Sequence, residues 1–485
     1  MWGSFVGFHH SIFDFHGFRQ AQTAISAEFM EHGGQFLRYQ TPVLGPPWSI
    51  PFEFPLYQKI VAAISEHFRV RLDETGRAVS IAFFYLCFLP LASILKRLRY
   101  APVQILAVLS LFAVSPLYIF VSRLFMIESM ALFLSLMYVD MIFGLVTGDR
   151  PWQYRYMFLA AIFGSLAGVV KVTTFAAFFL LGAAVGMWQL WKAYRNRSLP
   201  RSRIAAVILL GGLLPLSFTV WWTLFAGTVR AQNPLCVSIL GKGLDLNWNF
   251  GTLAERLHPA NYALLMHRIA GQAGSLPLLL LLGVVYAIVV RRWNAAALVS
   301  LGLYITAPMI FFHLHLIHEY YPYSSAIFLV VSAALLVADL LSLPGRRAWL
   351  GFAFLVAMIA TCVVRYQGGF YQTQRRNAPG RPGAAAIIDR TTNPDDVIVI
   401  TGLSWSSELP YQSRRRAITD FSVAYPFDPL AAVISNQGAQ TIPEVVVCDE
   451  SRGTDRARSL LHLTGIPDTT TLHADDCDVY LRPPH

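Results

Sequence analysis

Residues 204–226 read IAAVILLGGLLPLSFTVWWTLFA, a run of apolar and small polar side chains without a single charge. A bilayer core about 30 Å thick requires about 20 consecutive apolar residues in a helix, so this stretch is long enough to cross a membrane. Further apolar segments occur at 76–95, 101–121, 125–147, 155–170, 173–191, 275–290, 295–312, 323–342 and 348–364. We therefore predict an all-α polytopic membrane protein with about ten transmembrane helices.

The composition agrees with this class. Hydrophobic residues make up 55% of the 485 residues and charged residues only 14%, against roughly a quarter charged in soluble globular proteins. Segments 155–170 and 173–191 could be read as one helix, but such a helix would be too long for a single span. Because Lys171 lies between the two runs, we predict two separate spans.

Most of the positive charge lies in five short loops between these segments. The loops hold 14 cations and one acid, so their net charge of +13 exceeds the +10 of the whole chain. The acid is Asp149, and the cations are Lys96, Arg97, Arg99, Arg150, Arg155, Lys192, Arg195, Arg197, Arg201, Arg203, Arg291, Arg292, Arg346 and Arg347. These loops alternate with the others, which is typical of cytoplasmic loops. We expect no nucleic-acid partner, because no basic stripe accompanies an exposed aromatic platform.

With the basic loops inside, the non-cytoplasmic side receives residues 1–75, 122–125, 171–173, 227–274, 313–322 and 365–485. Residues 1–75 form a first extracytoplasmic loop, in which the spacing of apolar residues over 54–68 predicts an amphipathic helix on the membrane surface. Residues 76–365 form the transmembrane domain, which includes an outer loop at 227–274. Residues 366–485 follow outside. Because residues 1–75 have to be carried across the membrane, we expect a transmembrane helix upstream of residue 1.

The polarity of the chain changes after residue 365. Short β-like runs occur at 397–400, 445–447 and 478–481, and helical patterns at 383–390, 428–435 and 455–463. This alternation predicts a small soluble α/β domain over 366–485. Two of the five cysteines, Cys448 and Cys477, belong to it, and an oxidising compartment would permit a disulfide between them.

Polar residues concentrate at four places on the predicted outer side. They are residues 9–24, HHSIFDFHGFRQAQTA; 46–58, PPWSIPFEFPLYQ; 122–128, SRLFMIE; and 313–323, HLHLIHEYYPY. Away from their ends the spans carry no charge except Asp140, near the inner end of one. Transporters place ionisable groups at mid-membrane depth, so this distribution favours chemistry at the outer membrane surface.

The four clusters resemble motifs of bacterial GT-C glycosyltransferases, in particular the protein O-mannosyltransferases and lipid A aminoarabinose transferases of glycosyltransferase family 39. The shared elements are Asp14 followed by FRQAQTA at 18–24, EFPLYQ at 53–58, SR at 122–123 with Glu128 five residues after the arginine, and HEYY at 318–321. The resemblance covers residues 10–330. Family members begin with a transmembrane helix before the first loop, and the aminoarabinose transferases place a lysine where this chain has Phe54.

The resemblance implies a sugar donor linked to polyprenyl phosphate and an inverting transfer to an acceptor hydroxyl. Such a reaction needs a carboxylate that takes the acceptor proton, and we predict Asp14 as this general base. It also needs cations against the departing phosphate, which the arginine fork suits, and an apolar groove for the prenyl chain. The predicted substrate-binding residues are His16, Arg19, Gln20, Glu53, Arg123, Glu128, Lys171, His318, Tyr320 and Tyr321.

Some of these residues have structural alternatives in the first loop. Asp14 could be the N-cap of a helix that starts near His16. Arg19 either contacts phosphate or anchors the acid. Glu53 could bind substrate or a divalent cation, or it could cap the helix at 54–68.

The membrane-side candidates have alternatives as well. Glu128 and Arg123 could form an ion pair that positions their loop, and Lys171 could snorkel to the interface. His315 and His318 are three residues apart and would share a helix face, so a metal site is conceivable there beside donor binding by His318. No cofactor is certain from the sequence, and a divalent cation stays an open alternative.

We therefore predict a polyprenyl-phosphate-sugar-dependent glycosyltransferase in the bacterial inner membrane, with its active site and C-terminal domain on the extracytoplasmic side. The acceptor is an unidentified lipid, glycan or protein, and membrane lipid surrounds the spans. The alternative is a multi-pass lipid or sugar transporter or flippase, which would depend on Asp140 or on mid-span prolines such as Pro116 and Pro215.

Overall fold

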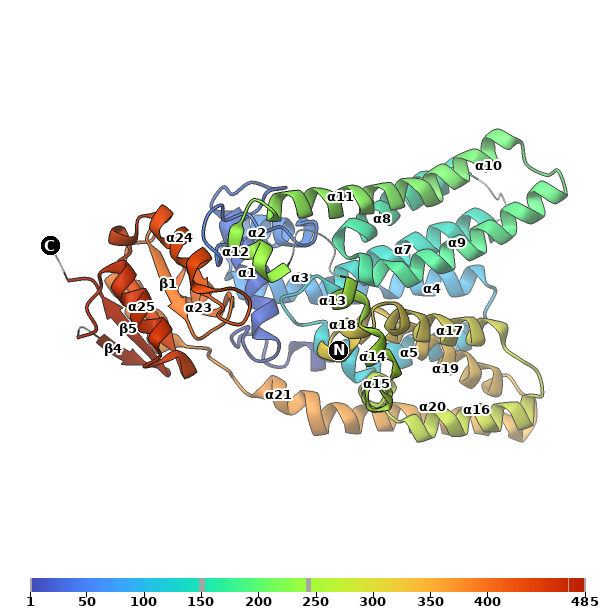
Figure 1. Ribbon diagram of the computed structural model, residues 1–485. Helices are drawn as coiled ribbons and strands as arrows, with labels where there is room; N and C mark the ends of the chain where they lie inside the picture. The colour runs from blue at the N-terminus through green and yellow to red at the C-terminus, as the bar shows by residue number, and fades with distance from the viewer. Residues whose placement is uncertain (1, 148–152, 241–245, 470, 484–485) are drawn as a thin grey trace. The chain divides into compact units, whose positions relative to one another are not determined.

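The computed structural model describes residues 2–147, 153–240, 246–469 and 471–483, so Asp149 and Arg150 of the predicted basic loops lie outside the described residues. The chain divides into two compact units, which we describe in turn (Figure 1). Unit 1 comprises Met1–Phe8, Arg77–Trp222 and Leu246–Arg375, and unit 2 comprises His9–Gly76, Thr223–Asp245 and Arg376–His485.

Unit 1 is helical. Its helices, two of which (α3 and α11) continue into unit 2, are α3 (Leu72–Leu86), α4 (Phe88–Arg97), α5 (Pro102–Val114), α6 (Pro116–Val121), α7 (Glu128–Thr147), α8 (Tyr154–Val170), α9 (Val172–Arg195), α10 (Arg201–Ile208), α11 (Leu214–Arg230), α13 (Leu246–Phe250), α14 (Leu253–Leu257), α15 (Pro259–Ala273), α16 (Leu276–Val290), α17 (Ala295–Ile310), α18 (Phe312–Ile317), α19 (Ala326–Leu341), α20 (Ala348–Arg365) and α21 (Tyr371–Arg375). Every apolar segment predicted from the sequence contains a helix.

Five helical stretches are long and apolar enough to cross a membrane: Leu72–Arg97, Glu128–Thr147, Val172–Arg195, Arg201–Arg230 and Gly345–Arg375. A sixth candidate is the bent pair α15 and α16, and four shorter apolar helices, α5, α8, α17 and α19, accompany them. The all-α polytopic class is confirmed. Full-length spans in the described part of the chain are fewer than predicted, because several predicted segments form helices of under 18 residues.

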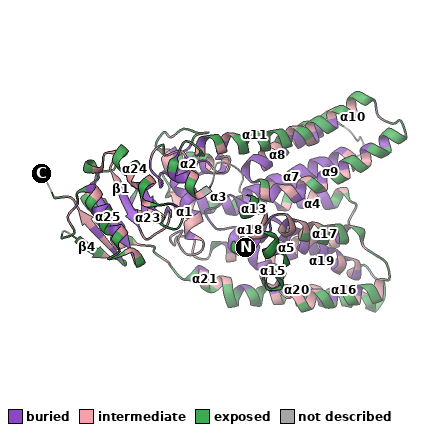
Figure 2. Cartoon of the chain, viewed as in Figure 1, coloured by how far each residue is buried: buried purple, intermediate pink, exposed green. Residues whose placement is uncertain are grey.

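Burial separates central from peripheral helices in unit 1. In α7, 78% of the apolar window is buried, whereas in Arg201–Arg230 and Gly345–Arg375 the share is 22%. A helix that is apolar all round and buried all round belongs to the centre of a bundle. The peripheral helices expose large apolar side chains, such as Leu280, Val284 and Ile288 of α16 (Figure 2), as expected where lipid is the solvent.

Two polar residues within the apolar segments take up clear structural roles. Lys171 has extended backbone angles, φ −160° and ψ 94°, and separates α8 from α9, so the prediction of two helices is confirmed. Asp140 accepts hydrogen bonds from Ser93 Oγ and Arg97 Nε, both at 2.8 Å. Its charge is thus compensated by a neighbouring helix, which removes one feature that the transporter alternative required.

Unit 2 contains a mixed sheet with helices on both faces. Its strands are β1 (Val397–Thr401), β2 (Arg416–Asp420), β3 (Glu444–Cys448), β4 (Thr471–Ala474) and β5 (Cys477–Leu481), in the order β2-β1-β3-β5-β4. Its helices are α1 (Gly17–Glu31), α2 (Leu56–Phe68), α12 (Pro234–Leu240), α22 (Pro382–Thr391), α23 (Glu408–Ser413), α24 (Phe427–Gln437) and α25 (Asp455–Thr464). β1 pairs in parallel with β2 and β3, and β5 is antiparallel to β3 and β4. The predicted α/β domain is confirmed.

The first loop contributes to the edge of this sheet. The N–H groups of Ala417 and Thr419 in β2 donate to the carbonyls of Pro42 and Val43, both at 3.0 Å, and an antiparallel bridge joins Leu44 to Ile418. The side chains of Val43 and Leu44 are fully buried in the core on this face of the sheet. Residues 42–44 therefore act as a short sixth strand that covers an otherwise open edge.

The amphipathic helix predicted over 54–68 is present as α2, which packs against α1. Its side chains Tyr57, Val61 and Ala62 are fully buried or nearly so within unit 2. Its position at a membrane surface stays a prediction.

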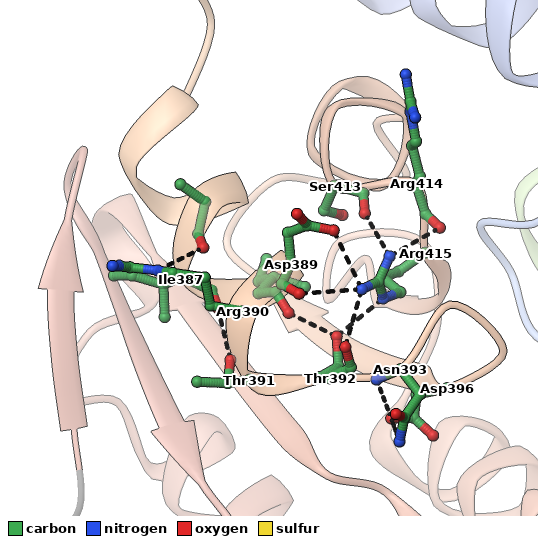
Figure 3. Close-up of polar contacts among 12 residues, drawn as sticks. Ile387, Asp389, Arg390, Thr391, Thr392, Asn393, Asp396, Ser413, Arg414 and Arg415 are labelled. Atoms are coloured by element: carbon green, nitrogen blue, oxygen red, sulfur yellow. Dashed lines mark hydrogen bonds and ion pairs between the residues drawn. The ribbon is translucent and has the colours of Figure 1, made fainter.

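Arg415 joins α22 to β2 (Figure 3). Its Nε donates to Thr392 Oγ1 at 2.9 Å, and its Nη atoms donate to the carbonyls of Ser413 at 3.0 Å and Thr392 at 2.9 Å. We expect Arg415→Met to lower the free energy of unfolding of this region by about 3 kcal/mol, because it strands several buried acceptors. Arg414→Met is the matched control: that side chain is 79% exposed, so the loss should stay below about 1 kcal/mol. Hydrogen exchange of β1 and β2 amides under increasing denaturant measures both, and equal effects would contradict the assignment.

The predicted disulfide is confirmed: Cys448 and Cys477 are bonded, facing each other across β3 and β5. The bond closes a loop with a sequence separation of 29 residues. A disulfide that closes a loop of this size stabilises the folded state by about 3 kcal/mol, so we expect the Cys448→Ser/Cys477→Ser variant to unfold at a lower temperature. Thermal unfolding with and without reductant tests this, since reductant should lower the midpoint of the wild type and leave that of the variant unchanged.

Candidate functional site

In unit 2, the loop that carries Asp14 is held by the first turn of α1. The side-chain amide of Gln20 donates to the Phe15 carbonyl at 2.7 Å and to Asp14 Oδ1 at 3.4 Å. α1 begins at Gly17, and its N-cap is His16, in a left-handed conformation with φ 49° and no side-chain capping bond. The N-cap position that the sequence offered to Asp14 is thus occupied by His16. A Cβ atom at Gly17 would lie 2.8 Å from Glu408 Oε1, so the close approach requires glycine.

Arg19 and Glu53 form an ion pair in unit 2. Arg19 Nη2 donates to Glu53 Oε1, and Nη1 donates to Gln22 Oε1. Both side chains remain partly accessible, at 15% for Arg19 and 22% for Glu53. The N-cap position of α2 is occupied by Pro55, two residues after Glu53. The acid that Arg19 contacts here is Glu53, whereas the sequence-based alternative was that it anchors the general base.

The backbone on either side of Glu53 is fixed by two side chains. The Tyr39 hydroxyl accepts from the Phe52 N–H at 2.7 Å and donates to the Glu53 carbonyl at 3.1 Å. Arg230 Nη1 donates to the Pro51 carbonyl at 2.6 Å. These contacts stabilise the segment, because the Pro51 carbonyl, the Phe52 N–H and the Glu53 carbonyl each have a hydrogen-bond partner. The sequence contained no signal for either.

In unit 1, Glu128 and Lys171 form a buried ion pair, with side chains only 4% and 7% exposed. Lys171 Nζ donates to Glu128 Oε1, and it lies 5.2 Å from the ring centroid of Tyr320 and 4.9 Å from that of Tyr321. The structure thus brings four predicted substrate-binding residues together. The break between α8 and α9 makes this arrangement, since it turns the lysine out of helical register.

The predicted ion pair between Glu128 and Arg123 is wrong, because the partner of Glu128 is Lys171. Arg123 is fully buried, and its guanidinium carbon lies 5.6 Å from the ring centroid of Phe120. The snorkelling alternative for Lys171 is also wrong, because its ammonium is buried rather than extended to water.

The histidine cluster spans α18, which contains His313 and His315, and the residues directly after it, which include His318. His318 stacks on Tyr321 with ring centroids 5.2 Å apart and lies 5.3 Å from Tyr320. Trp248, which the sequence motifs did not include, lies 6.4 Å from the same imidazole. His318 is therefore part of an aromatic cluster with the two tyrosines that face Lys171.

His315 and His318 do not share a helix face, because α18 ends at Ile317 and His318 has extended backbone angles. His315 is buried, its Nδ1 bonds the Phe311 carbonyl at 2.9 Å, and burial lowers the pKa of the imidazole to about 4. Its ring is thus neutral near pH 7. Among the described residues there is no group of three or more His, Cys, Asp or Glu side chains that could hold a metal ion.

Two solved structures of ArnT from Cupriavidus metallidurans, one bound to undecaprenyl phosphate and one in the apo state, each give a TM-score of 0.61 at 13% identity, over 95% of this chain and 93% of that chain. The archaeal oligosaccharyltransferase AglB from Archaeoglobus fulgidus, in complex with an inhibitory peptide and a dolichol-phosphate, gives a TM-score of 0.51 at 10% identity, over 89% of this chain and 65% of that chain. No family model and no curated protein matches the sequence. At these identities the likeness is one of fold, and the fold of this chain is that of the GT-C glycosyltransferases.

Proposed function

We propose that this protein transfers a sugar from a polyprenyl-phosphate donor to an acceptor hydroxyl at the outer face of a bacterial inner membrane. The observation that carries the proposal is the fold likeness to ArnT over 95% of the chain, since that structure was solved with undecaprenyl phosphate bound. The polar clusters within each unit support the same reading, because they supply the carboxylates and cations that such a transfer uses.

The proposed reaction inverts the anomeric carbon. The acceptor oxygen attacks that carbon, the bond to the donor phosphate breaks, and Asp14 takes the hydroxyl proton as general base. Gln20 supports this role, because its amide bonds both the Asp14 carboxylate and the adjacent Phe15 carbonyl. The products are the glycosylated acceptor and polyprenyl phosphate, and no redox partner is needed.

In unit 1, we assign the donor phosphate to Lys171, with Arg123 as a second cation. The Lys171 ammonium forms an ion pair with Glu128 and cation–π contacts with two tyrosine rings, and these interactions hold it in one position. A fixed cation stabilises a departing phosphate better than a mobile one, because no reorganisation is needed as charge develops. In unit 2, the pair of Arg19 and Glu53 is assigned to substrate binding, with Glu53 also the candidate ligand for a divalent cation.

An apolar cavity in unit 1 supports the binding of a prenyl chain. Its volume is about 270 Å³, and it lies among α4, α7, α9, α17 and α19. Phe178 of α9 lines it, about 10 Å along the helix from Lys171 at 1.5 Å per residue. A chain that begins at a phosphate on Lys171 can reach such a cavity.

The disulfide supports an extracytoplasmic C-terminal region. Disulfides persist in oxidising compartments and are rare in the cytosol. The bond between Cys448 and Cys477 therefore fits the topology that the basic loops predict, in which this region lies outside.

The test uses the full-length protein in nanodiscs with a panel of polyprenyl-phosphate sugars, each radiolabelled in the sugar, together with membrane lipid and glycan extracts as acceptors. We expect label from one donor to move to an acceptor while free polyprenyl phosphate accumulates. If no donor loses label, but proteoliposomes move a fluorescent lipid-linked sugar between leaflets, the protein is a transporter and the proposal fails.

A further inference from the structure

The outer loop of unit 1 contains a sharp change of direction. α15 and α16 are bent by 81° at a break of only two residues, Gly274 and Ser275. Gly274 has φ 87°, and a Cβ atom there would lie 2.6 Å from Thr361 Oγ1, so the chain passes α20 closely. α16 is an apolar helix with exposed Leu280, Leu281, Val284 and Ile288. If α16 follows the membrane normal, α15 lies almost in the membrane plane, and Figure 1 shows the two helices running in different directions.

α15 is buried only toward its C-terminal end. There Ile269, Gln272 and Ala273 are buried, and Arg268 donates to the carbonyl of His315 and, at 2.9 Å, to that of Leu316. The preceding turns expose large apolar residues: Tyr262 at 37%, Leu264 at 39% and Met266 at 48%. The buried contacts anchor the C-terminal end of the helix, so the exposed turns belong to a fixed element.

α13 and α14 expose further apolar residues just before α15. They are Leu246 at 61%, Trp248 at 49%, Leu253 at 72% and Leu257 at 71%. This is not a loose segment. Thr252 and Glu255 form a capping box at the start of α14, and Arg256 donates to the carbonyls of Met309 at 2.7 Å and Ile310 at 3.1 Å.

Leucines so exposed on anchored helices imply an apolar neighbour, because each apolar Å² left in water costs about 25 cal/mol. That neighbour is lipid, because α15 is directly connected to the end of the apolar helix α16. Tyrosine and tryptophan in the same exposed set are the residues that favour the membrane–water interface.

We propose that α14 and α15 lie in the membrane–water interface, with Leu253, Leu257 and Met266 inserted among lipid chains. Arg268 and Arg256 then link this lipid-seated segment to the ends of α17 and α18, directly before His318. The bilayer surface thereby sets the height of the histidine and tyrosine cluster, whatever substrate that cluster binds.

The experiment places a bimane fluorophore at single cysteines in nanodiscs. The free cysteines Cys87, Cys236 and Cys362 are buried, so background labelling of the native cysteines should be low. For Met266→Cys and Leu253→Cys, we expect several-fold stronger quenching by lipids spin-labelled near the head group than by iodide in the water. Val423→Cys is the control for a water-exposed position, because Val423 is 88% exposed in unit 2, and it should show the opposite preference.

Three results would overturn the proposal. Quenching of both loop positions by iodide, as at Val423, would place the segment in water. Stronger quenching by lipids labelled at the chain end would indicate a re-entrant helix pair rather than an interfacial one. Protection from both quenchers would mean that protein, not lipid, covers the segment. Two positions on different helices keep the test valid if one variant fails to fold.

Discussion

An Asp14→Asn variant is expected to lose glycosyl transfer while it keeps its fold and its affinity for the donor lipid. The amide has nearly the same shape as the carboxylate but cannot accept the acceptor proton, and removal of a general base costs about 10²–10⁴-fold in rate. Gln20 should still hold the loop, since its stronger bond goes to the Phe15 carbonyl at 2.7 Å. Initial rates with the labelled donor, alongside donor-lipid binding to the same preparation, separate the two effects.

Asp468→Asn is the matched control for this substitution. Asp468 is an exposed carboxylate in the same unit, so the change in charge is identical and transfer should persist at the wild-type rate. An Asp14→Asn protein that retains more than a tenth of the wild-type rate would remove Asp14 as the base. A loss of both transfer and donor binding would instead point to a structural role.

The second large effect concerns the buried pair of Lys171 and Glu128. Glu128→Gln or Lys171→Met alone leaves one buried charge without its partner, and we expect each to cost roughly 3–5 kcal/mol of stability. The double variant Lys171→Met/Glu128→Leu buries no charge, so its stability should return close to that of the wild type. Transfer should not return with it, because the proposed phosphate contact is gone.

The ion pair of Arg97 and Asp140 provides the control for this cycle. It is also a contact between helices of unit 1, with Asp140 6% exposed, but none of its residues is assigned to substrate. Arg97→Met/Asp140→Leu should therefore fold and transfer sugar at close to the wild-type rate. If Lys171→Met/Glu128→Leu folds and is equally active, the pair is purely structural and the donor phosphate must bind elsewhere. Thermal unfolding in detergent and the labelled-donor assay measure both halves of the cycle.

The membrane architecture could be predicted from sequence because its determinants are local. Apolar runs of bilayer length mark the helices, and a single lysine at position 171 marks the break between two of them. In the C-terminal region β1, β3 and β5 were predicted, since β1 and β3 are rich in β-branched residues and β5 carries adjacent valine and tyrosine. β2 was missed because its sequence, RAITD, follows two arginines, begins with a third and reads as polar. Backbone pairing with β1 and with residues 42–44 stabilises β2 as a strand despite its polar composition.

The contacts among the candidate residues could not be predicted from the sequence. The motifs singled out Glu128, Tyr320 and Tyr321, and Lys171 was selected from its place at a helix end. The ion pair of Glu128 and Lys171 joins positions 43 residues apart, and no local sequence pattern indicates it. The helix face assumed for His315 and His318 failed because α18 stops one residue too early. The role of Arg268 could not be predicted, because it donates to the backbone carbonyls of His315 and Leu316, and every residue type has a backbone carbonyl.

The pairing of residues 42–44 with β2 has a consequence for protein engineering. From its composition, which differs from that of the helices before it, the C-terminal domain would be expected to fold independently. Cutting it away at residue 376 would, however, leave Val43 and Leu44 stripped of their covering and would deprive β2 of its neighbour in the excised piece. Each half would then expose apolar side chains or an unpaired strand edge and be prone to aggregate, and a chimera between two proteins of this fold would have to exchange the first loop and the C-terminal region together.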